Sequence, residues 1–254
     1  MAAVRAKKHL GQHFLNDENI ALKIVKSLSL NNQNILEIGP GMGVLTKYLL
    51  QREGIHLKVI DIDDESVEYL HDRFPTMQSN IIHADFLKAN LYDFFNGPLS
   101  VIGNFPYNIS SQILFKVLDY RNIVNEVVGM FQKEVAVRIA SPPGNKDYGI
   151  MSVLMQAFYH IDFLFTVSEH VFTPPPNVKS AVIRLRRNQE QFLDCDEERF
   201  FKVVKTGFNQ RRKTLRNALS SVGFEKEILS GEIFSKRAEQ LNVQDFIQLT
   251  QMIK

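Results

Sequence analysis

Short apolar runs recur from residue 34 to about residue 186, and amphipathic stretches separate them. Strands joined by crossover helices produce this pattern, so we expect an α/β domain with a parallel, Rossmann-like sheet. The expected buried strands are Asn34–Ile38, Lys58–Ile60, Asn80–His83, Leu99–Gly103, Val127–Phe131, Phe163–Val167 and Ala181–Leu185. The expected helices between them include Val44–Arg52, Glu65–Phe74 and one that begins at Ser110.

The pattern changes after Arg187, where apolar positions recur only at helical spacing. The helices expected there are Glu197–Gly207, Thr214–Ser220, Lys226–Leu229, Arg237–Gln240 and Val243–Lys254. We therefore expect a domain boundary near residue 188, with residues 1–187 in the α/β domain and 188–254 in a small all-helical domain. Residues 1–33 are expected to be an N-terminal extension with a helix at Asn19–Leu28.

Four residues with binding chemistry come directly after expected strands: Gly39, Asp61, Asp85 and Asn104. The carboxyl ends of parallel strands meet at one edge of a sheet, and ligands bind at that edge in open α/β folds. The sequence therefore predicts one site to which all four residues contribute.

A glycine-rich turn, Gly39-Pro40-Gly41-Met42-Gly43, follows the first strand and precedes a helix. Glycines allow close approach of the backbone to a ligand, and the helix offers free N–H groups. Val44 stands where the dinucleotide fingerprint requires its third glycine, which disfavours a dehydrogenase. The Glu37 carboxylate would repel a pyrophosphate but suits an ammonium group, such as the methionine part of S-adenosylmethionine. A turn that merely needs glycines is the alternative.

Two carboxylates fit the remaining parts of such a nucleoside ligand. Asp61 can accept hydrogen bonds from both hydroxyls of a ribose, and Asp85 can accept one from an adenine amino group. Each aspartate taken alone is more often a helix cap or a solvated loop residue. The interpretation as a binding site depends on the whole set of strand ends.

The segment Asn104-Phe105-Pro106-Tyr107 suggests an acceptor site for an exocyclic adenine amine. The Asn104 amide oxygen and the Pro106 carbonyl can hold the two N–H groups and expose the nitrogen lone pair to a methyl sulfonium. Tyr107 can stack on a base that has left its helix. We expect Phe172, beside a proline-rich segment, to supply a second stacking ring, with covering of the core as its alternative role.

The 30 basic and 28 acidic residues give a net charge of only +2, so net charge does not indicate an acidic partner. The distribution of charge along the chain does indicate such a partner, because every charged residue from Arg199 to Arg216 is basic. This stretch predicts a positive patch that contacts RNA phosphates through Arg211, Arg212, Lys213 and Arg216. A solvated helical face is the alternative.

The single cysteine, Cys195, excludes an intramolecular disulfide framework and a multi-cysteine zinc ribbon, and it fits a reducing compartment. No metal site is predicted. The chain has no run of about 18 apolar residues and no apolar signal segment at its start, so we expect neither a membrane span nor secretion. The expected location is the cytoplasm.

These motifs resemble, in order along the chain, those of the KsgA-type ribosomal RNA small-subunit adenine dimethyltransferases. The matching blocks are His9–Leu15, Glu37–Gly43, Val101–Gly103, Asn104–Ser110, Phe131–Ala136, Pro174–Val182 and Phe208–Leu215. Two positions depart from the family pattern: Phe105 replaces the commoner leucine, and Asp61 stands where glutamate is frequent.

The resemblance implies a class I S-adenosylmethionine-dependent methyltransferase that converts two adjacent adenosines of the small-subunit rRNA 3′-terminal hairpin into N6,N6-dimethyladenosine. By position it assigns His13 and Leu15 to cofactor contacts, Gly39 to the methionine end, Asp61 to the ribose and Asp85 to the adenine. Asn104 would lie between cofactor and amine. The implied partner is the immature small ribosomal subunit, and a monomer is expected.

Two further functions remain open. An Erm-type methyltransferase that acts on large-subunit rRNA has similar cofactor motifs, although Tyr107–Ser110, Pro174–Pro176 and Arg211–Lys213 look more like KsgA. A non-catalytic RNA-binding assembly factor could keep the same fold. The intact Asn104, Pro106 and Tyr107 argue against the latter.

Overall fold

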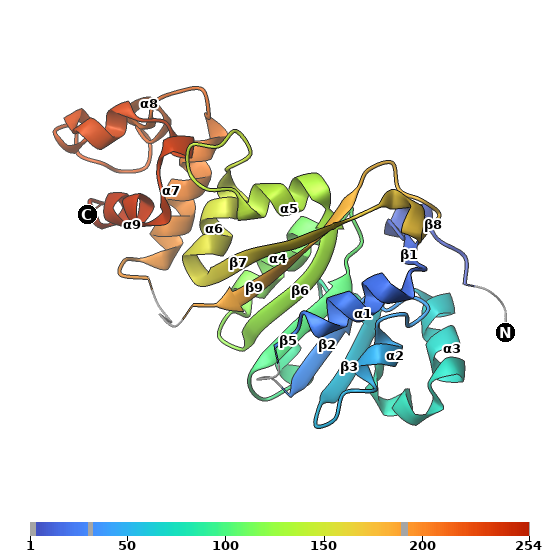
Figure 1. Ribbon diagram of the computed structural model, residues 1–254. Helices are drawn as coiled ribbons and strands as arrows, with labels where there is room; N and C mark the ends of the chain where they lie inside the picture. Colours follow the sequence, from blue (N-terminus) through green and yellow to red (C-terminus); the bar gives the residue numbers. More distant parts are fainter. Residues whose placement is uncertain (1–3, 30–32, 189–192, 254) are drawn as a thin grey trace. The chain divides into compact units, whose positions relative to one another are not determined.

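A seven-stranded mixed sheet in the order β4-β3-β2-β5-β6-β9-β7 is the framework of the α/β part of the chain (Figure 1). We describe it from a computed structural model that covers residues 4–29, 33–188 and 193–253. The strands of this sheet are β2 (Asn34–Ile38), β3 (His56–Asp61), β4 (Ile81–His83), β5 (Leu99–Asn104), β6 (Val124–Gln132), β7 (Tyr159–Val167) and β9 (Ser180–Arg187). All seven expected strands are present, with ends that differ by a few residues.

Strand direction differs from the expectation of a wholly parallel sheet. β4, β3, β2, β5 and β6 pair in parallel, but β9 runs antiparallel to β6, with Gln132 opposite Ser180. The apolar run at 181–185 indicates that a strand is buried there. It contains no information on the direction in which the strand enters the sheet.

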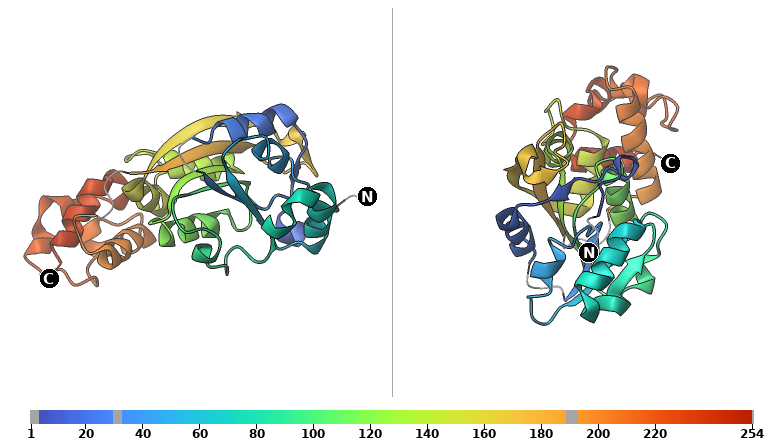
Figure 2. Two further views of the ribbon diagram at one scale, coloured as in Figure 1. Left: turned by 90° about the horizontal axis from the view of Figure 1, so that it is seen from below. Right: turned by 90° about the vertical axis from the view of Figure 1, so that its right-hand side faces the viewer.

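Helices cover both faces of the sheet, and α1 and α4 lie on opposite sides of it (Figures 1 and 2). The α-helices of this part are α1 (Glu18–Lys26), α2 (Thr46–Leu49), α3 (Asp64–Arg73), α4 (Ser110–Asp119) and α5 (Lys133–Ala140). Short 3-10 helices occur at Lys8–Leu10, Pro75–Asn80, Leu91–Asp93 and Glu169–Val171. Ile24 and Val25 of α1 are buried against Leu45, Leu49 and the strands. This packing is the usual way in which amphipathic helices protect a parallel sheet.

A second, two-stranded sheet fixes the N-terminal segment, and the sequence pattern did not predict it. β1 (Phe14–Leu15) pairs antiparallel with β8 (Phe172–Thr173), and the Asn16 N–H extends the contact to the Val171 carbonyl at 2.8 Å. Immediately after β1, the Asp17 carboxylate caps α1 by accepting from the N–H groups of Asn19 and Ile20. The N-terminal extension is therefore held to the rest of the first sheet-containing part through residues 14–20, by its pairing with β8 and by the capped start of α1.

The chain forms two compact units, one of residues 1–136 with 162–187 and one of residues 137–161 with 188–254. The second unit contains α6 (Ile150–Phe158), α7 (Glu197–Asn209), α8 (Leu215–Ala218), α9 (Val243–Gln251) and 3-10 helices at Ile228–Ser230, Glu232–Ser235 and Ala238–Gln240. Residues 137–161 thus join the C-terminal helices, which differs from a single boundary near residue 188. The apolar face of α6 explains the difference, because Phe158 stacks on Phe201 of α7.

The ends of the C-terminal helices also differ from expectation. The helices expected at 226–229 and 237–240 are 3-10 turns, and α9 ends at Gln251, while Lys254 lies outside the described residues. Across the described parts of the chain, no helix combines the length and the apolar character needed to cross a membrane.

Candidate active site

The four predicted strand-end residues, Gly39, Asp61, Asp85 and Asn104, line one cleft of about 1070 Å³. They follow or end β2, β3, β4 and β5, which are neighbours in the sheet. The chain leaves β2 toward β3 on one side and returns to β5 on the other, so the cleft lies where the strand order reverses. This is the position at which open α/β sheets bind ligands.

The glycine-rich turn needs its glycines for conformation and for space. Gly39 and Gly41 have φ values of 63° and 54°, in the left-handed region. A Cβ at Gly41 would lie 2.8 Å from the ring of Phe14, and one at Gly39 would lie 3.7 Å from Pro106. The turn therefore packs against both the N-terminal segment and the Asn104–Tyr107 segment.

Asp61 connects β3 to this turn. Its Oδ2 accepts from the Gly41 N–H at 3.2 Å, and its Oδ1 accepts from the Asp63 N–H at 3.0 Å. Burial raises the pKa of Asp61, while these backbone hydrogen bonds act in the opposite direction. The carboxylate is thus oriented by backbone donors before any ligand binds.

Glu37 is the most buried acidic group of the cleft, with 1% of its surface exposed. One oxygen accepts a hydrogen bond from the Thr46 hydroxyl at 2.6 Å. Burial raises the pKa of Glu37 to about 8, and the hydrogen bond from Thr46 opposes that shift. The Glu37 carboxyl therefore holds its proton at neutral pH unless a cation approaches it.

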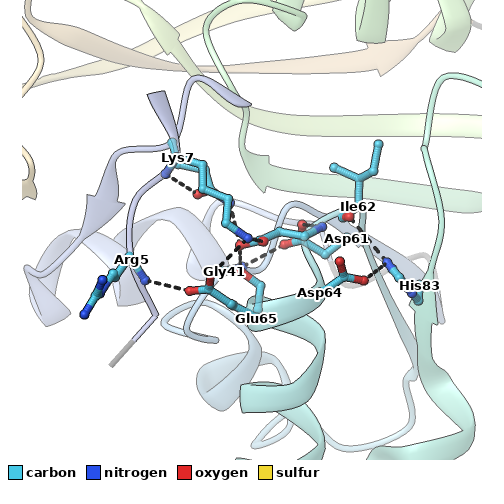
Figure 3. A network of polar contacts seen from close by, with 11 residues as sticks. Arg5, Lys7, Gly41, Asp61, Ile62, Asp64, Glu65 and His83 are labelled. Atoms are coloured by element: carbon cyan, nitrogen blue, oxygen red, sulfur yellow. Dashed lines mark hydrogen bonds and ion pairs between the residues drawn. The ribbon is translucent and has the colours of Figure 1, made fainter. Parts of the chain in front are cut away.

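Residues 7–16, which we call the strap, run along the cleft. Lys7 forms an ion pair with the buried Asp63. It forms another, at 3.3 Å, with Glu65 (Figure 3). Gln12 Nε2 donates to Asp63 at 3.1 Å. Burial acts to raise the pKa of Asp63, but the hydrogen bonds from these donors outweigh it and lower that pKa. The strap contributes Leu10 to Leu15 to the lining of the cleft.

The strap also orients Asn104. Asn104 Nδ2 donates to the His13 carbonyl at 2.8 Å. Only the NH₂ end of an amide can donate to a carbonyl, so this contact assigns the orientation of the side chain and leaves Oδ1 as the acceptor. Phe105, next to Asn104, is buried against Phe131, at 5.1 Å between ring centroids.

Tyr107 is held from two sides. Its hydroxyl lies 2.5 Å from Ser180 Oγ, and the His13 ring lies beside it in a tilted arrangement, at 5.3 Å between centroids and 32° between planes. His13 Nδ1 contacts the Pro174 carbonyl at 2.7 Å. Tyr107 and Pro106, which were expected on the acceptor side, and His13, which was expected at the cofactor, all line the cleft.

Phe172 corrects the sequence-based interpretation. It lies in β8 opposite Leu15, is 3% exposed and belongs to the hydrophobic core. A ring with so little exposed surface has no face to offer a base, and it does not line the cleft. The alternative role, covering the core, describes its position.

Several contributors to the site were not predicted from the sequence: Gln12, Phe14, Asp63 and Ser180. Gln12 and Phe14 lie within the N-terminal block that carries the resemblance, which was the available signal. Ser180 lies within another such block, Pro174–Val182, but its contact with Tyr107 and that of Asp63 with Gln12 join residues far apart in the chain, and no local pattern marks Asp63. Within the described residues, no cluster of three or more histidine, cysteine or acidic side chains suits a metal ion.

The basic residues proposed for RNA lie in the second unit, three of them between α7 and α8 and Arg216 within α8. Arg211, Arg212, Lys213 and Arg216 are exposed. Arg216 Nε donates to the Leu229 carbonyl at 2.9 Å, and Arg211 donates to the Lys146 carbonyl. These contacts leave both guanidinium charges unneutralised. By contrast, Arg184 and Arg186 at the end of the first unit both pair with Asp162.

At the switch point, the cleft has a buried acidic side chain, Glu37, beside the glycine-rich turn, and an oriented amide, Asn104, faces the cleft from β5. This combination defines the class of protein, a Rossmann-like S-adenosylmethionine-dependent methyltransferase. The family model described as "Ribosomal RNA adenine dimethylase" matches residues 3–254, and the chain belongs to that family.

Individual relatives agree with this assignment. The chain is 62% identical over 255 residues to "Ribosomal RNA small subunit methyltransferase A" of Cytophaga hutchinsonii, covering 100% of this chain and 99% of that protein. A dimethyladenosine transferase from Plasmodium falciparum has a similar structure, with a TM-score of 0.80 and 25% identity over 93% of this chain and 96% of that one. The 23S rRNA methyltransferase ErmE shares the fold, with a TM-score of 0.69 at 24% identity over 94% of this chain and 99% of that one.

Proposed function

We propose that the protein methylates the N6 amines of two adjacent adenosines in the 3′-terminal hairpin of small-subunit rRNA, giving N6,N6-dimethyladenosine. The names of its full-length relatives support the substrate. The observation that carries the proposal is Asn104, whose amide is fixed by the strap so that an acceptor oxygen is left at the edge of the cleft.

The cleft fits S-adenosylmethionine by its shape and by its buried carboxyl groups. Gly41 has space only for a hydrogen beside Phe14, the turn is left-handed at Gly39, and Glu37 and Asp61 are buried carboxyl groups. Glu37, with Gly39 and Gly41, would hold the ammonium end, Asp61 the ribose, Asp85 the adenine, and His13 and Leu15 the open side. When bound, the cofactor supplies a methyl group on a cationic sulfur.

On the acceptor side, the chain orients the amine and does not act as a strong base. The Asn104 Oδ1 and the Pro106 carbonyl accept the two N–H groups, which turns the nitrogen lone pair toward the cofactor. Positive charge that develops on the amine is stabilised by these two oxygen dipoles. Tyr107 holds the base by stacking on it.

RNA affinity would come from the second unit, through Arg211, Arg212, Lys213 and Arg216. Four exposed cations without interleaved acids suit phosphates, whose contacts set affinity and not sequence. We propose further that the substrate is an immature small subunit and that the protein acts in the cytoplasm as a monomer. The single cysteine supports a reducing location.

Transfer of labelled methyl groups to ribosomal subunits that lack adenine methylation tests the proposal. We expect the wild-type protein to label the small subunit and not the large one, and mapped nucleosides to be N6,N6-dimethyladenosine. Asn104→Ala should reduce turnover by about 100-fold or more, with little change in cofactor affinity, because its contacts matter most during transfer. Asn96→Ala, an exposed position outside the cleft, is the matched control.

The outcomes separate the alternatives. Label in the large subunit would indicate an Erm-type activity. Tight binding of small subunits without any transfer would indicate an assembly factor. Near-normal transfer by Asn104→Ala would remove Asn104 from the acceptor site.

A further inference from the structure

A second pocket, with an empty volume of about 860 Å³, adjoins the cofactor cleft. The two share the lining residues Gly11, Gln12, His13 and Tyr107. Its other walls include Gln132, the last residue of β6, and the segment 174–178. The Tyr107 ring therefore stands at a wall common to both pockets, and the angle of that ring determines the shape of each.

Ser180 is the fixed point to which this ring is attached. It is the first residue of β9 and is fully buried. It pairs with Gln132 across the sheet, and the adjacent Lys133 N–H donates to the Lys179 carbonyl at 2.9 Å. Its Oγ, 2.5 Å from the Tyr107 hydroxyl, thus belongs to a buried strand end that pairing with β6 holds in place. Tyr107 belongs to the loop between β5 and α4.

A tyrosine on a loop has two free side-chain torsions, so its ring needs two restraints to keep one plane. The Ser180 hydroxyl restrains the far end of the ring, and the His13 ring restrains its side. Phe172, which is buried, supplies no further restraint on the acceptor side. Loss of the hydrogen bond to Ser180 would leave only one of the two restraints, the His13 ring, so the Tyr107 ring could take more than one angle.

We propose that Ser180 is a positioning residue for methyl transfer: it holds the Tyr107 ring at one angle, so that a purine base of the RNA meets Asn104 and Pro106 in a single orientation. This inference rests on the function proposed above. Ser180 acts only through Tyr107 and contacts neither the cofactor nor the reacting nitrogen.

A double-mutant cycle on Ser180→Ala and Tyr107→Phe tests the proposal, because each change removes one half of the hydrogen bond. We expect each single variant to lower kcat/KM for small subunits about five- to tenfold, the range for a neutral hydrogen bond. The double variant should lose no more activity than either single variant, because the same hydrogen bond is absent in all three. The dissociation constant for S-adenosylmethionine, measured by calorimetry, should stay within about twofold of the wild-type value.

Ser79→Ala, an exposed serine of the same unit, is the matched control and should equal wild type. If Ser180→Ala transfers methyl groups at the wild-type rate, or if the two losses multiply in the double variant, the proposal is overturned. If Ser180→Ala does not fold, Tyr107→Phe alone decides, and full activity in that variant is contrary to the proposal. Absence of transfer by the wild-type protein would instead contradict the proposed function.

Discussion

Glu37 shows how burial at one residue gives a binding site its pH dependence. Its pKa in the folded chain is about 8 because the carboxyl is buried, whereas the ordinary value is 4.5. Between these two values the unfolded chain has released the proton and the folded chain has kept it. The free energy of unfolding therefore falls as pH rises through this window.

An ammonium group brought to Glu37 lowers the pKa of its carboxyl, because the positive charge favours the ionised carboxylate. We predict that cofactor binding at pH 7 releases a large fraction of one proton, seen as a difference in calorimetric enthalpy between phosphate and Tris buffers. Glu37→Gln should remove most of that difference, whereas the exposed Glu53→Gln should keep it. Equal proton release by Glu37→Gln and wild type would refute the role of Glu37.

The residues that sequence could identify are those whose role depends on local position. Gly39, Asp61, Asp85 and Asn104 each follow a strand, and the carboxyl edge of a parallel sheet brings such residues together. Ser180 and Asp63 depend on which distant residue faces them. Phe172 could not be assigned because a loop aromatic and a core aromatic look the same in one sequence.

Among the elements, the strap connects the proposed cofactor side of the site with the proposed acceptor side. Its Lys7 and Gln12 bind Asp63 next to the Asp61 strand end, and its His13 carbonyl holds Asn104. A change at either end of the strap is therefore transmitted to the other through a continuous backbone of a few residues.

Lys7→Met removes the ion pair to Asp63 while keeping an apolar stem of similar length. We predict that it loosens the strap, so that trypsin cuts faster after the exposed Lys8, and that cofactor affinity falls about three- to tenfold. Mass spectrometry of the first fragments and calorimetry measure these two effects. Lys26→Met, on an exposed site of α1, is the control; an unchanged cleavage rate in Lys7→Met would show that the pair does not hold the strap.

Helices and strands could be predicted where the apolar pattern extended over enough residues to be recognised. The strands of the large sheet were found because each is a distinct buried run. β1 and β8, with two residues each, are too short to show a period. The antiparallel entry of β9 and the grouping of α6 with the C-terminal helices depend on tertiary pairing, which apolar spacing does not encode.

At the scale of the whole molecule, the cofactor cleft and the basic residues proposed for RNA belong to different units. Every residue that lines the cofactor cleft belongs to the first unit, and Arg211 to Arg216 belong to the second. Changes in the basic patch should therefore alter RNA binding without altering the cofactor cleft.

Replacement of Arg211, Arg212 and Lys213 by alanine should weaken binding of small subunits. The slope of log affinity against log salt should flatten by up to about 0.7–0.9 for each phosphate that the variant no longer binds, and cofactor affinity should not change. A triple variant at Lys26, Arg73 and Lys226, which are also exposed, makes the same change in net charge and serves as control. A wild-type salt slope in the patch variant would mean that these cations face only solvent.

The wall that Tyr107 and His13 form between the two pockets has a consequence for inhibitor chemistry. A single molecule with an adenosine-like group in the cofactor cleft and a flat ring in the second pocket has to extend only past these two side chains. Joining two fragments in this way makes the second attachment intramolecular, at an effective concentration in the millimolar range, and raises affinity by about 10²–10⁴ over either fragment. Adenosine mimicry alone fits many nucleotide-binding proteins, so the selectivity of such a bisubstrate compound would come from the part beyond Tyr107.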